Sequence, residues 1–264
     1  MITNNETITQ LAEQNQRLDG RALDEYRQPI AIETTISWTA EGSARVQIGE
    51  TVVLAGVKVA IEKPYNDTPD EGGIMVNVEL LPLSSPEYET GPPGIKAVEL
   101  ARVTDRGIRE AKAIDMKKLC ITPGEKAWFV MIDLVTINDD GNLFDAAGLA
   151  ALAALRSARF PVVDPKTGAI DYKKKTAEHL PIIKEPLPVT IYKIGSRFLV
   201  DPNQQEEQAY EARLTISSDE KGTISALQKG GDVPLTIEDI AQMVDLAVEK
   251  AKYLRKILNS FVKS

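Results

Sequence analysis

The sequence predicts an α+β protein in which mixed sheets pack against helices. Strand-like alternation of apolar residues precedes a helical pattern twice, over residues 30–114 and again over residues 189–260. We interpret this as a weak duplication of a strand–strand–helix unit. The composition of 43% hydrophobic and 27% charged residues supplies an ordinary globular core. With 264 residues, the chain has room for one large domain or two modest ones.

The first part of the chain is expected to hold one short helix followed by four strands. Residues 4–15 carry a polar helical pattern with Ile8, Leu11 and Ala12 on one face, so this helix packs loosely on the body or frays. The strand patterns occupy residues 30–38, 44–48, 51–61 and 74–83. Gly49 separates the second strand from the third and predicts a hairpin, because glycine readily adopts the turn conformation.

An irregular segment separates these strands from the first long helix. Residues 84–94 contain three prolines and two glycines, which excludes regular structure. A helix is expected from residue 95 to about residue 114. A strand over residues 128–137 and a turn over 139–142 follow. Residues 144–158, nearly all alanine and leucine, then predict a buried helix.

The connector between two domains is expected at residues 161–188. This segment is polar and contains five prolines and a run of three lysines. The predicted domains are residues 1–185, which include an extension over 1–16, and residues 186–264. The second domain begins with strand patterns at 189–193, 198–200, 211–217 and 222–227. It ends in a helix with a capping box of Thr236 and Asp239. The core-facing stripe of this helix comprises Ile240, Val244, Ala247, Ala251, Leu254 and Leu258.

The composition excludes several classes of protein. The net charge of −8 argues against a free-standing, non-specific nucleic-acid binder, although a local basic strip remains open. One cysteine, Cys120, and one histidine, His179, exclude a disulfide framework, a cysteine zinc site and a multi-histidine metal site. We interpret Cys120 as a small core residue and His179 as a surface residue. No apolar run approaches the ~18 residues that span a bilayer, so we expect a soluble, cytoplasmic protein without a membrane partner.

Three arginines in the first long helix are the strongest functional signal. Arg102, Arg106 and Arg109 are spaced by four and three residues, so a helix places them on one face. Guanidinium groups suit bidentate recognition of carboxylate or phosphate. The pattern fits two interpretations equally: binding of phosphate or of another subunit, and a solvated face paired with Glu99, Asp105 and Glu110.

Two acidic segments are weaker signals. Residues 201–211 place acidic side chains just after a strand, where they could hold a divalent metal or supply a general acid; a polar turn is the other interpretation. Residues 139–142 (DDGN) precede a helix whose N-terminus could bind an anion. Two aspartates there would repel phosphate, so we expect them to cap the helix.

Several motifs in order resemble those of the RNase PH family. They are residues 17–21 (RLDGR), residues 42–46 with 49–51, residues 105–109 (DRGIR), residues 123–125 (PGE) and residues 139–142. The resemblance covers about residues 17–260. It implies an RNase PH-like fold whose N-terminal part is similar to ribosomal protein S5 domain 2. It also implies phosphorolytic 3′–5′ degradation of RNA, in which inorganic phosphate releases nucleoside diphosphates.

The chain departs from the family pattern where active members carry their chemistry. Two aspartates of the active members correspond here to Glu207 and Arg213. A phosphate loop of glycine, serine and arginine is replaced by residues 141–143 (GNL). The resemblance therefore implies a non-catalytic member with no cofactor or metal of its own, most like the silent ring subunit of the archaeal exosome.

The resemblance also implies partners. Three copies of this chain would alternate with three copies of a catalytic paralogue in a hexameric ring, with RNA in the channel and RNA-binding cap proteins on one face. Inorganic phosphate and magnesium would serve the paralogue. Arg106 and Arg109, and more weakly Arg102 and Arg45, are the candidates for contact with RNA or with the partner's site. Two alternatives stay open: an active phosphate-dependent ribonuclease using Glu207 and Asp201, or a scaffold whose arginines bind only carboxylates.

Overall fold

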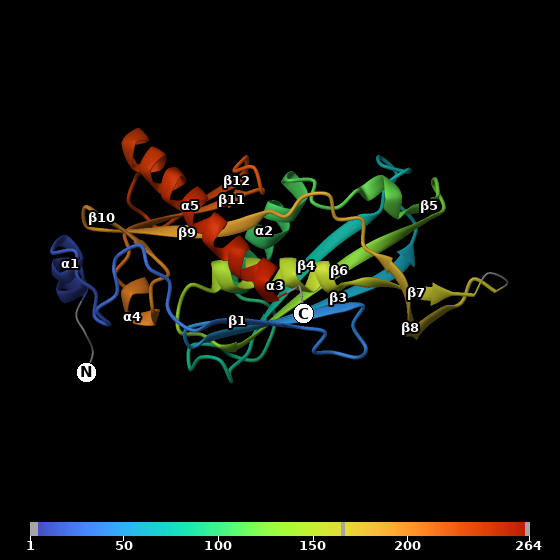
Figure 1. Ribbon diagram of the computed structural model, residues 1–264, viewed down its shortest axis with the longest axis horizontal. Helices are drawn as coiled ribbons and strands as arrows, with labels where there is room; N and C mark the ends of the chain where they lie inside the picture. Colours follow the sequence, from blue (N-terminus) through green and yellow to red (C-terminus); the bar gives the residue numbers. More distant parts are fainter. Residues whose placement is uncertain (1–4, 165–166, 262–264) are drawn as a thin grey trace.

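The protein is elongated and is built around two sheets with helices between and beside them (Figure 1). The computed structural model describes residues 5–164 and 167–261. The predicted α+β class is confirmed. Within the described chain, no helix combines the length and the apolar character needed to cross a membrane.

The first sheet is mixed. Its strands follow the order β1-β2-β3-β6-β4, and the short β5 pairs with β6. All neighbours are antiparallel except β4, which runs parallel to β6. The strands are β1 (Ile30–Thr34), β2 (Gly42–Ile48), β3 (Thr51–Glu62), β4 (Gly73–Leu80), β5 (Cys120–Thr122) and β6 (Lys126–Asn138). The β2–β3 hairpin predicted at Gly49 is confirmed, and Gly49 has a φ of +57°, which favours glycine.

Two helices lie on one face of this sheet. They are α2 (Ile95–Glu110) and α3 (Leu143–Ser157), which contact the sheet and each other. The buried helix predicted over residues 144–158 is confirmed, because every residue of α3 from Leu143 to Leu155 is buried. Small residues permit this close packing: a Cβ built on Gly148 would lie 2.0 Å from Cγ of Pro188 in β9.

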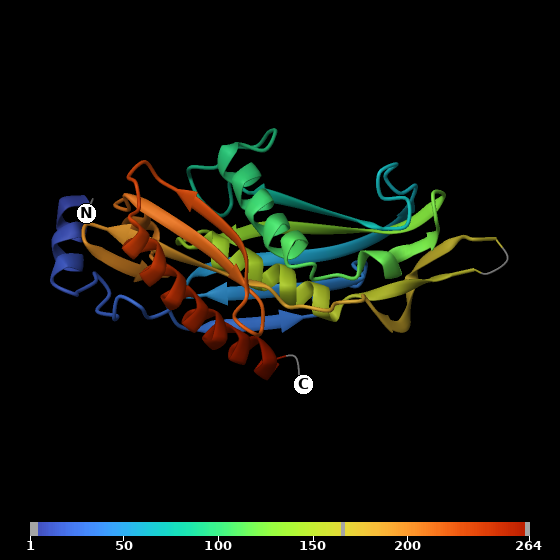
Figure 2. The same ribbon diagram turned by 90° about the horizontal axis from the view of Figure 1, so that it is seen from above.

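The second sheet packs on the other side of α3, which therefore occupies the core between the sheets (Figure 2). Its antiparallel strands follow the order β10-β9-β11-β12. They are β9 (Leu187–Ile194), β10 (Arg197–Val200), β11 (Ala212–Ser218) and β12 (Ile224–Gly230). The last helix, α5 (Ile237–Phe261), packs on β9 and β11. The Thr236–Asp239 capping box is confirmed by two reciprocal hydrogen bonds of 3.0 Å.

The structure corrects several expectations. A hairpin was not predicted within the connector at 161–188: β7 (Arg159–Val163) and β8 (Ile170–His179) pair and extend from one end of the molecule. Two short helices were not predicted: η1 (Met116–Leu119) and α4 (Gln204–Glu207). α2 also ends at Glu110, four residues earlier than expected.

Smaller differences concern single side chains. Ile240 is 37% exposed, and Met243 takes its place in the buried stripe of α5. Cys120 is half-buried on β5 rather than in the core, whereas His179 is exposed as expected. α1 (Asn5–Glu13) packs on the second sheet through the predicted Ile8 and Ala12, whereas the predicted Leu11 is only half-buried.

Candidate functional site

The three predicted arginines of α2 share one groove. Arg102, Arg106 and Arg109 are all exposed and line a groove of about 940 Å³, together with Gln228 of β12. The helical spacing therefore brings the three guanidinium groups to one surface.

The three arginines differ in how firmly they are held. Arg109 forms a bidentate ion pair with Asp105, at 2.7 and 3.0 Å, and donates to the carbonyl oxygen of Ile74 at 2.9 Å. The hydrogen bond with Asp105 raises the pKa of Arg109. Arg106 donates to Oε1 of Gln228 at 3.1 Å. Among the described residues, none forms a hydrogen bond or ion pair with the side chain of Arg102, so its guanidinium group is the freest of the three.

Arg45 lies apart from these three arginines. It sits on β2 between the buried Ala44 and Val46, so its side chain points to the face of the sheet away from α2 and α3. It pairs with Glu33 of the neighbouring strand at 3.1 Å. The structure therefore does not join Arg45 to the α2 groove.

The two predicted degenerate positions lie together in a second cavity. Glu207 and Arg213 both line a space of about 240 Å³, where α4, β11 and the first turns of α2 and α3 meet. Lys96 and Glu99 of α2 and Tyr192 of β9 also line it. The other polar lining residues are Glu87, Gln204, Gln208 and Tyr210.

Arg213 is fixed in this cavity by its neighbours. It is 4% exposed, and its Nη2 donates to Oε1 of Glu99 at 2.6 Å. Its guanidinium carbon lies 4.1 Å from the ring centre of Phe144. Its Nη1 is buried and has no hydrogen-bond partner among the described residues. A guanidinium group repels a divalent cation and does not release a proton, so this position supplies neither a metal ligand nor a general acid.

Glu207, the last residue of α4, places its carboxyl group at the N-terminus of α3. Its Oε1 accepts hydrogen bonds from the backbone N–H of Asn142, at 2.7 Å, and from the Tyr192 hydroxyl group, at 2.8 Å. Burial raises the pKa of Glu207 and outweighs the hydrogen bond from Asn142 and the attraction of Lys96, which lower it. A helix N-terminus is a natural anion site. Here the carboxyl group of the chain itself takes the place that a bound anion would use.

The aspartates before α3 do not cap it as expected. The N-cap residue is Asn142, which has a φ of 54° and makes no side-chain capping bond. Asp139 accepts from the N–H of Gly141, at 3.0 Å, and from Lys96, at 3.1 Å. Asp140 pairs with Arg27 at 2.9 Å. Both aspartates thus hold the turn and its neighbours instead of the helix end.

Comparison with known proteins shows the family. A model of the 3′ exoribonuclease family, domain 1, matches residues 26–161, and a model of domain 2 matches residues 184–250. The chain belongs to the 3′ exoribonuclease family. The resemblance to RNase PH proteins that the motifs indicated is thereby confirmed.

Curated members of this 3′ exoribonuclease family are similar over nearly their whole length. The exosome complex component Rrp42 of Thermococcus gammatolerans is 49% identical over 253 residues, 95% of this chain and 92% of that protein. The Methanothermobacter thermautotrophicus protein of the same name is 45% identical, over 96% of this chain and 93% of that protein.

Solved structures of exosome proteins are also similar to this chain. A chain of the Archaeoglobus fulgidus exosome with RNA bound to the active site superposes with a TM-score of 0.87 at 40% identity, covering 96% of each chain. A chain of an archaeal exosome core gives a TM-score of 0.84 at 38% identity, covering 97% of this chain and 96% of that one. The predicted RNase PH-like fold is confirmed.

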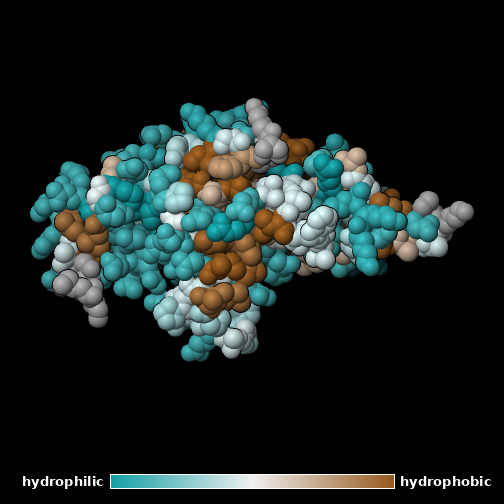
Figure 3. All heavy atoms as spheres, turned by 60° about the horizontal axis from the view of Figure 1, so that its bottom comes forward, coloured by the Kyte–Doolittle hydropathy of each residue, from teal (hydrophilic) through white to brown (hydrophobic). Residues whose placement is uncertain are grey.

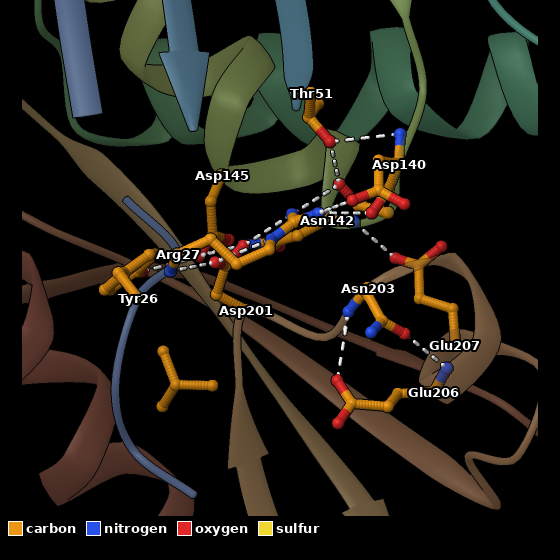
Figure 4. Close-up of polar contacts among 12 residues, drawn as sticks. Tyr26, Arg27, Thr51, Asp140, Asn142, Asp145, Asp201, Asn203, Glu206 and Glu207 are labelled. Atoms are coloured by element: carbon orange, nitrogen blue, oxygen red, sulfur yellow. Dashed lines mark hydrogen bonds and ion pairs between the residues drawn. The ribbon is translucent and has the colours of Figure 1, made fainter. Parts of the chain in front are cut away.

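Beside the cavity, a buried polar network joins distant parts of this family member (Figure 4). At its centre Asp201 is fully buried. Its carboxylate accepts from Nε and Nη2 of Arg27, at 3.0 and 2.8 Å, from the backbone N–H of Arg27 at 2.6 Å, and from Asn142 at 2.8 Å. Asp201 was a candidate metal ligand or acid in the sequence, but both of its oxygens are engaged in structural hydrogen bonds. No group of three or more His, Cys, Asp or Glu residues in the described part of the chain is arranged to hold a metal ion.

A buried ion pair next to this network was not predicted. Arg17 donates from Nε and Nη2 to the two carboxylate oxygens of Glu206, at 2.9 and 2.5 Å, and from Nη1 to the carbonyl oxygen of Val200, at 2.8 Å. Glu206 also closes a capping box with Asn203 at the start of α4. The RLDGR motif that begins at Arg17 marks the arginine of this pair in the sequence, but no local pattern marks Glu206 as its partner.

Asp145 of α3 gives the network a dependence on pH. It is fully buried and accepts hydrogen bonds from the Tyr26 hydroxyl at 2.7 Å, from Asn142 at 3.1 Å and from the N–H of Thr190 at 2.7 Å. Burial raises the pKa of Asp145 to about 7, against the effect of these three hydrogen bonds, and the charge of Asp201 raises it further.

We therefore expect the folded state to lose stability as pH rises towards 7. Because the folded pKa of Asp145 lies above the unfolded value, its protonated form stabilises the fold fully below about pH 4, and this contribution is lost as pH rises through 7. Between pH 5 and 7, wild type should lose about 2 to 3 kcal/mol relative to Asp145→Asn, which does not titrate. Urea unfolding at both pH values measures this difference. Parallel pH profiles for the two proteins would contradict it.

Proposed function

We propose that this chain is a non-catalytic ring subunit of an RNA exosome, a complex that degrades RNA from the 3′ end by phosphorolysis. The observation that carries the proposal is the pair of side chains that line the cavity. Arg213 is buried there, and Glu207 accepts a hydrogen bond from the backbone N–H of Asn142 at the start of α3. The proposal is supported by relatives that are called exosome complex components and by a similar chain in an exosome with bound RNA.

The chemistry of phosphorolysis explains why this cavity should be silent. The reaction needs cationic or N–H donors that hold phosphate, and an acid or metal that stabilises the leaving oxygen. The N–H of Asn142 is already bound to Glu207, and Arg213 places a fixed positive charge where an acid would act. We infer that phosphate and magnesium serve the catalytic paralogue, and that this chain has no cofactor of its own.

The proposed assembly is a hexameric ring of three heterodimers with that paralogue, capped by RNA-binding proteins and located in the cytoplasm. Figure 3 shows an apolar band across the middle of the side that lies lowest in Figure 1. Half-buried Leu54, Met131 and Val135 point to the sheet face opposite α2 and α3. Apolar surface of this kind is typical of faces that partner chains cover.

The proposed RNA contact is the α2 groove. Arg102, Arg106 and Arg109 line it together, which suits phosphates spaced along one strand. Because Arg45 points from the opposite face of the sheet, we propose it as a contact to the partner rather than to the same RNA.

A phosphorolysis assay tests the proposed function. The purified chain is incubated with 3′-tailed RNA, magnesium and inorganic phosphate, alone and together with the catalytic paralogue, and nucleoside diphosphates are measured. We expect no product from the chain alone and rapid release with the paralogue. Product from the chain alone would contradict the proposal and favour an active enzyme that uses Glu207. Full activity of the ring without RNA crosslinks to α2 would favour a scaffold role.

A further inference from the structure

One tryptophan of this chain is almost entirely exposed. Trp38, in the loop between β1 and β2, is 96% exposed, whereas the other tryptophan, Trp128, is 9% exposed. Hydrogen bonds hold the loop on both sides of Trp38: the N–H of Ser37 donates to Oγ of Ser43 at 2.9 Å, and the N–H of Thr35 donates to the carbonyl oxygen of Ser43 at 2.8 Å. The indole is thus presented to solvent from a loop with a defined backbone.

Two lysines attach this loop to the β7–β8 hairpin and to β3. Nζ of Lys58 donates to the carbonyl oxygen of Thr39, the residue after Trp38, at 2.8 Å. The same Nζ lies 4.7 Å from the ring centre of Tyr172 on β8, which is 40% exposed. Nζ of Lys175 donates to the carbonyl oxygen of Ala40 at 2.5 Å. The loop and the hairpin therefore form one continuous surface with two exposed aromatic side chains.

This surface is locally basic, although the whole chain has a net charge of −8. Lys58 and Lys175 bind the loop, and the exposed Lys173 and Lys174 lie on β8 between Tyr172 and Lys175. Lys58 pairs with the buried Glu41 at 2.8 Å and Lys174 pairs with Asp171 at 3.6 Å. In the described part of the chain, no carboxylate forms an ion pair with Lys173 or Lys175. We call Trp38, Tyr172 and these four lysines the Trp38 patch.

The combination of residue types favours nucleic acid over protein as the occupant. Tryptophan is enriched at protein interfaces, but lysine is depleted there. Single-stranded nucleic acid uses both, because bases stack on aromatic rings and the phosphates require cations. We infer that the Trp38 patch is a second binding site for single-stranded RNA, in which a base stacks on Trp38 and the backbone passes Lys173 and Lys174.

The site is separate from the α2 groove. The two share no lining residue, and the patch lies at the end of the molecule from which β7 and β8 extend. The inference rests on the proposed function for the choice of RNA. The experiment uses this chain without its paralogue, so a failure of ring assembly or activation does not affect its result.

The fluorescence of Trp38 can report RNA binding directly. The full-length chain is titrated with oligouridine RNA while tryptophan emission is recorded in two variants. Trp128→Phe retains Trp38 alone, and its emission should be quenched on binding. Trp38→Phe retains Trp128 alone, and its emission should not change. An unchanged emission of Trp128→Phe at saturating RNA would overturn the inference. This outcome is expected if the patch binds an acidic protein instead of RNA.

Affinity measurements in the same chain separate stacking from charge. Trp38→Ala should weaken RNA binding about tenfold, and Trp38→Phe should restore most of it. Lys173→Glu with Lys174→Glu should lower the slope of log affinity against log salt by about 1.4. The matched control replaces the exposed Lys252 and Lys256 of α5 with glutamate and makes the same change in net charge. Equal losses in the patch variant and the control would overturn the inference.

Discussion

Arg17→Ala is expected to lower the free energy of unfolding by about 3 to 5 kcal/mol, because it leaves the buried carboxylate of Glu206 with only the more distant Arg21, at 4.0 Å, as a cationic neighbour. The side chains of Arg17 and Glu206 are 0% and 1% exposed, so solvent cannot replace the guanidinium group without opening the fold. Arg17 also satisfies the carbonyl oxygens of Val200 and Asp201, at 2.8 and 2.9 Å, which the alanine variant leaves without this donor. Urea unfolding measures the change.

A control separates burial from the loss of an ion pair as such. Arg45→Ala removes a half-exposed arginine whose partner, Glu33, is 61% exposed, and it should cost less than about 1 kcal/mol. A further variant, Arg17→Met with Glu206→Leu, should recover much of the stability lost in Arg17→Ala, because neither member of the pair then leaves a buried charge behind. Equal effects of Arg17→Ala and Arg45→Ala would show that the buried pair has no special role.

Arg106→Glu with Arg109→Glu should weaken RNA capture by the assembled ring at least about tenfold at low salt. Both guanidinium groups line the α2 groove, and their replacement puts carboxylates beside Glu99 and Glu110 in the same groove. The salt dependence should flatten as well, by about 0.7 in the log–log slope for each phosphate that the variant no longer neutralises. Filter binding or fluorescence anisotropy over a range of salt concentrations measures both effects.

The arginine variant needs a test of assembly, because Arg109 also holds the carbonyl oxygen of Ile74. Size-exclusion chromatography of the ring provides it, and the Lys252→Glu, Lys256→Glu variant controls for net charge. A ring that assembles normally and keeps both its RNA affinity and its salt slope would contradict the assignment of the α2 groove to RNA.

Elements with local signals could be predicted from the sequence. Gly49 marks a turn by its own conformational freedom, and the Thr236–Asp239 pair forms its capping box within one turn of helix. The hairpin inside the predicted connector was missed for the opposite reason. Its prolines and lysines indicate a loop locally, but the backbone of residues 170–179 pairs with residues 159–163, and pairing with a separate segment leaves no local pattern.

The residues of the candidate site likewise divide into those with a local signal in the sequence and those without one. The spacing of Arg102, Arg106 and Arg109 within one helix sufficed to predict their common face. The partner of Arg17 could not be predicted, because Glu206 is 189 residues away and the α4 segment that carries it is too short for a periodic pattern. Asp201 was noticed as an acidic residue after a strand, but only the fold shows that Arg27 occupies its oxygens.

The buried network also has a consequence for biosynthesis. Arg27 and Asp201 are 174 residues apart, so the N-terminal segment waits for its partner while the ribosome makes the rest of the chain. At typical rates of translation this wait lasts roughly 10 to 35 seconds. During it Asp201 and Glu206, the buried carboxylate partners of Arg27 and Arg17, have not yet been made, so the segment over residues 17–27, here called the N-terminal strap, cannot make these contacts. The strap can close only when residues 200–206 emerge, which makes its docking a late step in the maturation of the nascent chain.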